Sequence, residues 1–342
     1  MLKQAPQGIS PRFTLDTTQF SHIESALEEV GHVVIDHVFD RQTLTYCRQY
    51  AINLFSKMDV SYDEGKFSGG ELSSYLGNTY SFMPDAEGNR YCEFFMNMIA
   101  RSRILDLLSC LLNGDVAAIH GPVIRRVSAE HPLRNIGLHQ DSAIAEYADH
   151  GYRSQRQYSL WVPLCDVDEN TASLLLLSRR FQFTGDYGDI TKPRDRFSNA
   201  CICDGNSTIN VSSLYLQNQP RKHLSEQEAN QHTQDYYRTL NNLIEKLGND
   251  IYAPTLDETS VVIFNRDTIH GSFGHAGLTK SRHSIDIRFI ADFDQFRAYK
   301  NKERAYIFRR YSRYNYNPFS QDELSSLSYG GQIDNINSKI AW

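Results

Sequence analysis

The feature that most limits the fold of this chain is a series of short apolar runs that begins after its first third. The runs are separated by turn residues and comprise Ala117–Val127, Tyr158–Leu164, Ser173–Leu177, Ser260–Phe264 and Arg282–Ile290. Runs of this length between turn residues are typical of β-strands. Short strands spaced in this way favour a β-sandwich or β-barrel over a doubly wound parallel sheet. The sequence therefore predicts a mainly β core.

Helical patterns precede these strands. Ser21 and Glu24 have the spacing of a capping box, which predicts a helix start, and His32–Asp36 then reads as a short strand. Asp40 is placed to cap a second amphipathic helix, and a further helix is expected over Arg101–Leu112. Residues 60–91 are rich in Gly, Ser, Asp and Tyr, and we expect an irregular surface excursion there.

A long interval, residues 179–258, separates the third and fourth apolar runs. Ser225 and Glu228 form a second capping-box pattern there, and a helix is expected to follow and to end at Gly248. Residues 191–206 are polar and unpatterned. We interpret the interval as an insertion that either carries specificity at a barrel mouth or serves as a packing decoration or dimer contact.

The expected organisation is one domain over residues 1–342 with helical decoration around a β core. Its parts are a mainly helical N-terminal part (1–115), a core (116–178 and 259–292), the helix-containing insertion (179–258) and a C-terminal decoration (293–342).

Composition excludes some functions. The formal net charge is −6 and the pI is about 6.1, so there is no electrostatic footprint for nucleic acid. No apolar run has the length of a signal peptide or a membrane span, which predicts a cytoplasmic protein with no membrane partner. The six cysteines have no Cys-x-x-Cys spacing. We expect free thiols buried as small hydrophobic groups rather than a zinc site.

Three residues have the chemistry of a metal site. His139 and Asp141 are two positions apart, so on an extended strand their side chains leave the same face, and His270 would supply a third ligand from downstream. Two imidazoles and one carboxylate suit iron(II) and leave coordination positions open for a cosubstrate and dioxygen.

The last apolar run carries a polar row. Strict alternation puts Arg282, Ser284, Asp286 and Arg288 on one face of the strand. A turn-rich segment joins His270 to Arg282, so we expect their strands to pair as neighbours. The fork of Arg282 could then clamp a carboxylate near the metal, with Ser284 adding a hydrogen bond.

Together these motifs resemble the iron(II)/2-oxoglutarate-dependent oxygenases, specifically the phytanoyl-CoA dioxygenase-like superfamily. The similarity covers most of the chain. It comprises the opening segment 29–35, the first metal motif 138–141, the middle strand and turn at 161–170, and the closing motif 269–282.

The resemblance implies a double-stranded β-helix (jelly roll) with N-terminal helices. It implies that His139, Asp141 and His270 bind iron and act in catalysis. It also implies that Arg282 and Ser284 bind the far carboxylate of 2-oxoglutarate, with Ser272 and Trp161 near this cosubstrate. Dioxygen is the third reactant. The retained carboxylate of Asp141 favours hydroxylation over halogenation; desaturation, ring closure and epimerisation stay open.

Departures from the family pattern bear on the substrate. Asn170-Thr171-Ala172 replaces the usual Asn-Gly turn, and the Pro-Gly-Ser-His that commonly follows is replaced by residues 178–181. The pattern that begins at Arg282 also resembles a branch found in antibiotic and carbohydrate biosynthesis, which implies a small polar substrate. Arg288, and also Arg126, are candidates to meet that substrate.

Two other functional classes stay open. One is a non-redox jelly-roll metal protein that binds or isomerises a sugar-like ligand, which would not require Arg282. The other is a noncatalytic interaction protein on a retired oxygenase core. The expected partner is a small molecule, and the chain is expected to be a monomer or a homodimer.

Overall fold

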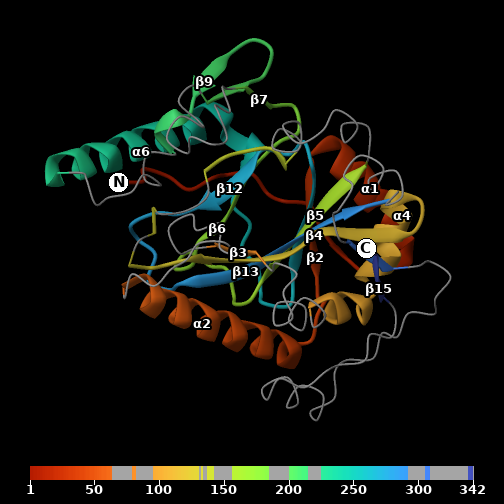
Figure 1. The fold of residues 1–342 in the computed structure, drawn as a ribbon. Helices are drawn as coiled ribbons and strands as arrows, with labels where there is room; N and C mark the ends of the chain where they lie inside the picture. Colours follow the sequence, from red (N-terminus) through yellow and green to blue (C-terminus); the bar gives the residue numbers. More distant parts are fainter. Residues whose placement is uncertain are drawn as a thin grey trace.

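The structure is a computed structural model, and it describes residues 1–63, 79–81, 95–130, 132–133, 137–141, 156–184, 200–214, 225–291, 305–308 and 338–341. Strands gather at the centre and helices lie outside them (Figure 1). The prediction of a mainly β core with helical decoration is confirmed for these residues.

A nine-stranded sheet forms the larger layer, in the order β1-β2-β11-β5-β13-β4-β14-β15, with β3 also paired to β4. Its central strands are antiparallel neighbours in which β13 pairs with both β4 and β5. Among the described strands of this sheet, β1 and β2 are the one pair that runs parallel. The strands are β1 (Arg12–Thr14), β2 (His32–Asp36), β3 (Thr79–Ser81), β4 (Val116–Val127), β5 (Gln157–Pro163), β11 (Val261–Asn265), β13 (Arg282–Ile290), β14 (Ala305–Phe308) and β15 (Ser338–Ala341).

Helices cover one face of this sheet. They are α1 (Phe20–Glu29), α2 (Arg41–Asp63), α4 (Ile104–Leu112) and the helical residues 95–100. In Figure 1, α2 lies beneath β13, and α1 and α4 lie together at one side. One apolar cluster joins these helices to alternate residues of β5, β11 and β13, and it includes Leu160, Ile263 and Ile285. Burial of this face is the main apolar contribution that fixes the register of the strands, since a slip of one residue would turn it to the other side.

A three-stranded sheet in the order β10-β6-β12 faces the other side of the larger sheet. Its strands are β10 (Ile251–Tyr252), β6 (Ser173–Leu177) and β12 (His270–Phe273). Trp161 and Phe264 of the larger sheet share an apolar cluster with Leu174 and Leu176 of β6. The two sheets therefore pack face to face over part of their area.

The outer face of the smaller sheet is covered by α6 (Glu226–Leu247), which continues into the 3-10 turn η5 (Gly248–Asp250). Buried residues of α6, including Leu240 and Ile244, pack in one cluster with Leu175 and Leu177 of β6. A second three-stranded sheet joins the same cluster: β7 (Gln182–Thr184), β8 (Cys201–Cys203) and β9 (Thr208–Asn210). Figure 1 shows it projecting above α6.

Several sequence signals for element ends are confirmed. Ser225 and Glu228 make both bonds of a capping box at the start of α6. The Asp40 carboxylate accepts from the amide of Thr43 at the start of α2. Asn113 adopts a left-handed conformation after α4, where such a residue ends a helix. In these three places, local hydrogen bonding and backbone preference suffice to set the boundary.

Other element predictions are corrected. The first helix begins at Phe20 after the 3-10 turn η1 (Thr17–Gln19), with Gln19 rather than Ser21 at its N-cap. Helix α2 continues to Asp63 and β3 lies within 79–81, so the irregular excursion predicted for 60–91 is wrong at these positions; 64–78 and 82–94 lie outside the described residues. Strand β8 falls within the stretch 191–206, which was expected to be unpatterned.

The cysteines also differ from expectation. The five described ones are free, but only Cys47 is fully buried. Cys110 is exposed, and Cys165, Cys201 and Cys203 are partly exposed, while Cys92 lies outside the described residues. Cys201 and Cys203 share the outward face of the short strand β8, whose inward side chain is Ile202. Within the described part of the chain, no helix has the length and apolar character needed to cross a membrane.

Candidate metal centre

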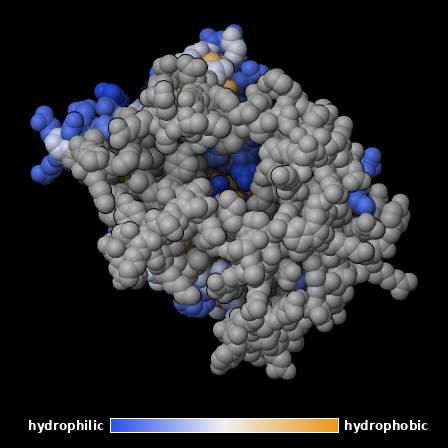
Figure 2. Space-filling view, viewed as in Figure 1, coloured by the Kyte–Doolittle hydropathy of each residue, from blue (hydrophilic) through white to orange (hydrophobic). Residues whose placement is uncertain are grey.

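The two facing sheets leave a cavity between them. The larger sheet lines it with side chains of β4, β5, β11 and β13, and the smaller sheet lines it with residues of β6 and β12. Figure 2 shows a hollow in this face of the molecule, with hydrophilic residues in its depth.

His139 and His270 meet in this cavity across a backbone bridge. The amide of each residue donates to the carbonyl of the other, at 2.8 and 2.9 Å. Their rings lie with centroids 4.2 Å apart. This bridge extends the edge of the smaller sheet at β12 by one residue pair, so the backbone itself holds the two imidazoles side by side.

Both imidazoles present the same nitrogen to the cavity. The Nδ1–H of His139 donates to the carbonyl of Gly137 at 2.9 Å, and that of His270 donates to the carbonyl of Thr268 at 3.0 Å. These bonds fix the tautomer in which Nε2 carries a lone pair, as in metal-binding histidines. Burial is the main reason that the pKa of His139 falls to about 3 and that the pKa of His270 is lowered. Both rings are therefore neutral near pH 7.

Asp141 completes the cluster. One ligand atom from each of Asp141, His139 and His270 lies within 4.8 Å of the others, and all three residues are buried. The carboxylate Oδ1 is 3.9 Å from His139 Nε2. Asp141 itself is not in a strand, so the expectation of one extended strand for both ligands is corrected: His139 forms an isolated bridge, and the chain leaves the extended conformation before Asp141.

The Asp141 carboxylate is held by the larger sheet. Ser159 donates to its Oδ2 at 2.7 Å. Arg288 donates to Oδ1 from Nη2 at 2.8 Å and to Oδ2 from Nε at 3.1 Å. Burial by itself would raise the pKa of Asp141, but Arg288 and the two imidazoles outweigh it and hold the pKa well below its usual range. The group is therefore an anion.

Arg282 is the fully buried cation at the other end of the polar row on β13. Its Nη1 donates to the carbonyls of Ala172 and Ser173 at 3.1 and 3.0 Å, and its Nη2 makes a long 3.4 Å contact with Ser272 Oγ. The guanidinium also lies over the ring of Trp161, 5.1 Å from its centroid. Burial lowers the pKa of Arg282 to about 10, so the charge persists at pH 7.

Within the described part of the chain, buried polar atoms at and beside this arginine have no hydrogen-bond partner. They are Arg282 Nε, Trp161 Nε1 and Ser284 Oγ. Unpaired buried donors are rare because each one loses its hydrogen bonds to water without replacement. Arg282 Nε and Nη2 lie on the same edge of the guanidinium, and among the described residues that edge is engaged only by the contact with Ser272. It is the edge that can bind a carboxylate through two parallel bonds.

The sequence predicts that the strands of His270 and Arg282 are neighbours, and this prediction is wrong. Strand β12 belongs to the smaller sheet and β13 to the larger one, so the turn between them carries the chain from one sheet to the other. The arginine bridges the sheets instead, from β13 to the carbonyls at the start of β6. Each strand stays with the layer that buries its own apolar face, which a reading of local turn residues does not reveal.

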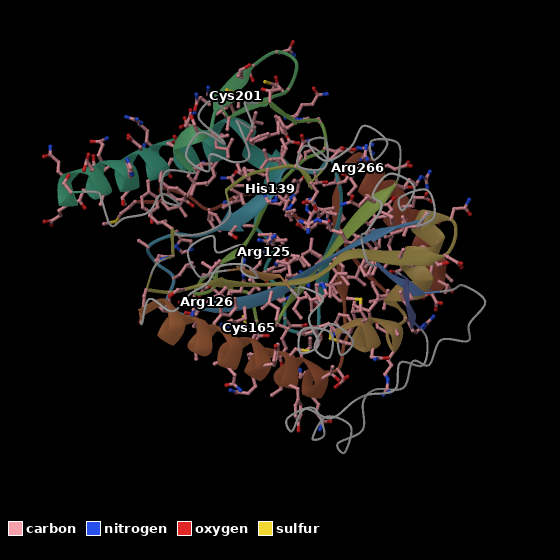
Figure 3. The ribbon with its side chains drawn as sticks, viewed as in Figure 1. Arg125, Arg126, His139, Cys165, Cys201 and Arg266 are labelled. Carbon is pink, nitrogen blue, oxygen red and sulfur yellow. The ribbon has the colours of Figure 1, made fainter. Side chains whose placement is uncertain are left out.

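The structure separates the two arginines of β4. Arg125 faces the cavity and forms an ion pair with Asp286. Arg126 points to the opposite face, where its guanidinium lies 4.7 Å from the centroid of the Phe55 ring of α2 (Figure 3). The selection of Arg126 as a cavity residue is thus corrected, and Arg125 takes that place. Arg288 does line the cavity, but it is paired with Asp141.

Sequence reasoning did not select Ser159, Arg125 or Phe264 for the site. Each lies on a strand whose inward face is set by pairing, since Ser159 is opposite Arg288 and Arg125 is opposite Ser284. Once β13 has been assigned an inward polar row, these registers identify the partners. The information needed to find these residues is therefore the register between paired strands. The alternation of residues within one strand does not give that register.

No protein-family model and no curated protein sequence matches this chain. Solved structures do match. The crystal structure of EctD from S. alaskensis with 2-oxoglutarate and 5-hydroxyectoine has a TM-score of 0.50 and 15% identity, over 84% of this chain and 85% of that one. AviO1 from Streptomyces viridochromogenes Tue57 gives 0.46 and 12%, over 81% and 96%. The α-ketoglutarate-dependent epimerase SnoN gives 0.44 and 12%, over 81% and 84%.

The similarity to EctD is one of fold. It shows that this chain shares the fold of EctD, whose crystal structure contains 2-oxoglutarate and 5-hydroxyectoine. The site geometry described above stands independently of that similarity, because it rests on the contacts of this chain alone.

Proposed function

We propose that this protein is an iron(II)- and 2-oxoglutarate-dependent dioxygenase that hydroxylates an unactivated C–H bond of a small polar metabolite or biosynthetic intermediate. One observation carries the proposal: a buried guanidinium with an almost unengaged edge shares a cavity with a buried His-Asp-His cluster. A metal-binding protein without an acidic cosubstrate would leave that edge of the guanidinium without a ligand. We further propose that the two facing sheets form a double-stranded β-helix within a single domain.

The donor set fits iron(II). His139 and His270 would each offer a neutral Nε2, and Asp141 would offer a carboxylate oxygen, which is the facial set typical of non-haem iron oxygenases. The ionised state of Asp141 and the neutral state of both imidazoles at pH 7 mean that no proton has to leave before a cation binds. The three residues would therefore hold the metal without rearrangement of their charges.

The surroundings of Arg282 fit the far carboxylate of 2-oxoglutarate. Nε and Nη2 would donate to it in parallel, and Ser284 Oγ and Trp161 Nε1 are buried donors that have no other partner in the described ranges. Ser272, which touches Arg282, would complete this end of the site. The carbonyls of Ala172 and Ser173 fix the opposite edge of the guanidinium, so its free edge is oriented before the cosubstrate arrives.

When bound together, iron, 2-oxoglutarate and dioxygen supply an oxidant strong enough to remove hydrogen from a C–H bond, with succinate and carbon dioxide as coproducts. The residues of the chain bind and orient these reactants. The packed apolar residues Leu174 and Phe264 line the cavity beside the polar row. Arg125 and Asp286 add a further ion pair that a polar substrate could meet.

The test is anaerobic addition of Fe(II) and 2-oxoglutarate to the purified protein, followed by air. We expect a visible charge-transfer band under anaerobic conditions and succinate formation after air is admitted. Asp141→Ala should lose both, because one of three metal ligands is gone. The matched control is Asp257→Ala, which removes a carboxylate remote from the cavity.

Absence of the band and of succinate in the parent protein would contradict the proposal. Binding of the metal without any response to 2-oxoglutarate would instead favour the non-redox metal protein. Substrate candidates can then be screened by whether they accelerate 2-oxoglutarate turnover.

A further inference from the structure

We propose that Ser159 and Arg288 are positioning residues that hold Asp141 as the third metal ligand from the larger sheet. The inference rests on the proposed metal site and deepens it. Arg288 was a candidate for substrate contact by sequence, but its guanidinium is engaged with Asp141 through two atoms, at 2.8 and 3.1 Å. Its role is thereby moved from the substrate to the ligand.

Asp141 needs such support because its backbone does not provide it. His139 and His270 are fixed by their shared backbone bridge on the smaller sheet. Asp141 follows that bridge at a position that is not part of a strand. Its carboxylate is instead hydrogen-bonded to side chains of the larger sheet. The orientation of the carboxylate therefore depends on these side-chain bonds rather than on backbone pairing between strands.

The fastening residues are themselves rigidly placed. Ser159 and Arg288 are directly opposite each other on the paired strands β5 and β13. Ser159 is 2% exposed and Asp141 is 4% exposed, so the bond between them is shielded from water, while the side chain of Arg288 is 18% exposed. Oδ2 accepts from both Ser159 and Arg288, whereas Oδ1 accepts from Arg288 alone among the described residues. Oδ1 is also the oxygen nearer to His139 Nε2, which leaves it as the ligand atom.

Arg288 has two effects on a bound cation, and they oppose each other. Its positive charge repels the metal, while its fork fixes the carboxylate that binds the metal. The variants Arg288→Lys and Arg288→Gln separate these effects, because Lys keeps the charge without the planar fork and Gln removes the charge. If position dominates, both variants bind metal more weakly. If charge dominates, Gln binds more tightly and Lys is unchanged.

The experiment measures Co(II) binding to the metal-free, full-length protein by the visible absorption of the bound ion, which reports its ligand set as well as its affinity. We expect the Kd to rise about 10- to 100-fold for both Arg288 variants and roughly 10-fold for Ser159→Ala, the range found for residues that orient metal ligands. The Co(II) spectrum should change with each of them.

Two controls match these changes in kind. Ser260→Ala removes a buried serine that donates to the carboxylate of Asp36 at 2.8 Å, and Arg12→Gln removes a two-point pair with the same carboxylate. Both are remote from the cavity and should leave the Co(II) Kd and spectrum unchanged. A general loss of stability would move the controls and the test variants together.

The decisive arm uses Asp141→Ala as background. If Ser159 and Arg288 act through Asp141, their substitution in that background should have no further effect on Co(II) affinity. Equal affinity of all single variants and the parent would overturn the positioning role while the oxygenase proposal stands. Tighter binding by Arg288→Gln with parent-like Arg288→Lys would also overturn it. A parent protein that binds no Co(II) and no Fe(II) would overturn both proposals.

Discussion

At the scale of single residues, Arg282 and Ser284 contrast although they lie two positions apart on the same face of β13. Arg282 already makes three contacts that join the two sheets. Ser284 is fully buried, and its hydroxyl has no partner among the residues that the structure describes. Arg282 therefore contributes to stability in the absence of any ligand, whereas the hydroxyl of Ser284 is available to one.

This contrast gives a prediction. Arg282→Ala should lower both stability, by about 3 kcal/mol or more, and 2-oxoglutarate affinity, because two carbonyls lose a charged donor. Its effect on metal affinity should be far smaller. Ser284→Ala should leave the free energy of unfolding unchanged or slightly raised and weaken 2-oxoglutarate binding by about 10-fold. Urea unfolding and equilibrium binding measure the two quantities. A destabilised Ser284→Ala protein with unchanged affinity would show that the hydroxyl has a structural role.

The residues of the site that could be predicted from the sequence were those whose side-chain chemistry is distinctive. His139, Asp141, His270 and Arg282 belong to rare spacings whose donor types suggest one reaction, and the structure gathers all four in one cavity. Ser159 could not be found in this way, because a serine on an apolar strand has no distinctive pattern. Its importance arises only from its position opposite Arg288.

At the scale of elements, α6 supports the turn that joins β12 to β13. The hydroxyl of Tyr236 donates to the carbonyl of Gly274 at 2.9 Å, and that of Tyr237 accepts from the amide of Ala276 at 2.5 Å. This turn links the strand of His270 to the strand of Arg282. The helix of the insertion is thus connected to the geometry of the site, although it lies on the outer face of the smaller sheet.

The hydroxyl groups of the two tyrosines should contribute different amounts to the free energy of unfolding. Tyr236→Phe leaves the buried Gly274 carbonyl without this donor and should cost about 1–3 kcal/mol of stability. Tyr237→Phe should cost less, since Ala276 is exposed and water can replace the hydroxyl. Urea unfolding of both variants, with hydrogen exchange at the turn amides, measures the difference. A larger loss for Tyr237→Phe would contradict this account of burial.

The sequence predicted helices and strands well where a local pattern of residues marks them, and it predicted the pairing of strands less well. Capping residues identified the start of α6, because its capping bonds join residues three positions apart, and apolar runs identified β2 and β13, whose residues are mostly buried. The assignment of β12 and β13 to different sheets depends on which layers bury their faces, and neither turn composition nor alternation contains that information. The same limit applies to Arg125 and Arg126, whose faces are set by pairing with β13.

At the scale of the whole molecule, several buried histidines are uncharged. Burial lowers the pKa of His32 to about 3 and is the largest cause that lowers the pKa of His283 to about 4. His139 and His270 add to this group. The ordinary pKa of histidine is 6.5, so in mildly acidic solution the unfolded chain binds protons that the folded chain does not. The contribution of these histidines to the free energy of unfolding is therefore fully present above pH 6.5, and it is lost as the pH falls below 6.5.

His32 provides the test because it is remote from the metal cluster. It is buried against Tyr252, and its Nε2 is 2.9 Å from Ser10 Oγ. Each such histidine contributes a slope of roughly 1.4 kcal/mol per pH unit between its two pKa values. We expect His32→Gln to reduce the slope of unfolding free energy against pH by about that amount between pH 4 and 6. Urea unfolding of the metal-free protein at several pH values measures it; an unchanged slope would mean that His32 is protonated in the folded state.

The division of the metal ligands between two layers has a mechanical consequence. The imidazoles belong to the smaller sheet, while the carboxylate is fastened to the larger one. A bound cation would then cross-link the two sheets, and its binding energy would oppose their separation. The ion would be released when the sheets move apart, so the rate of metal exchange would report how often the two layers of the core separate.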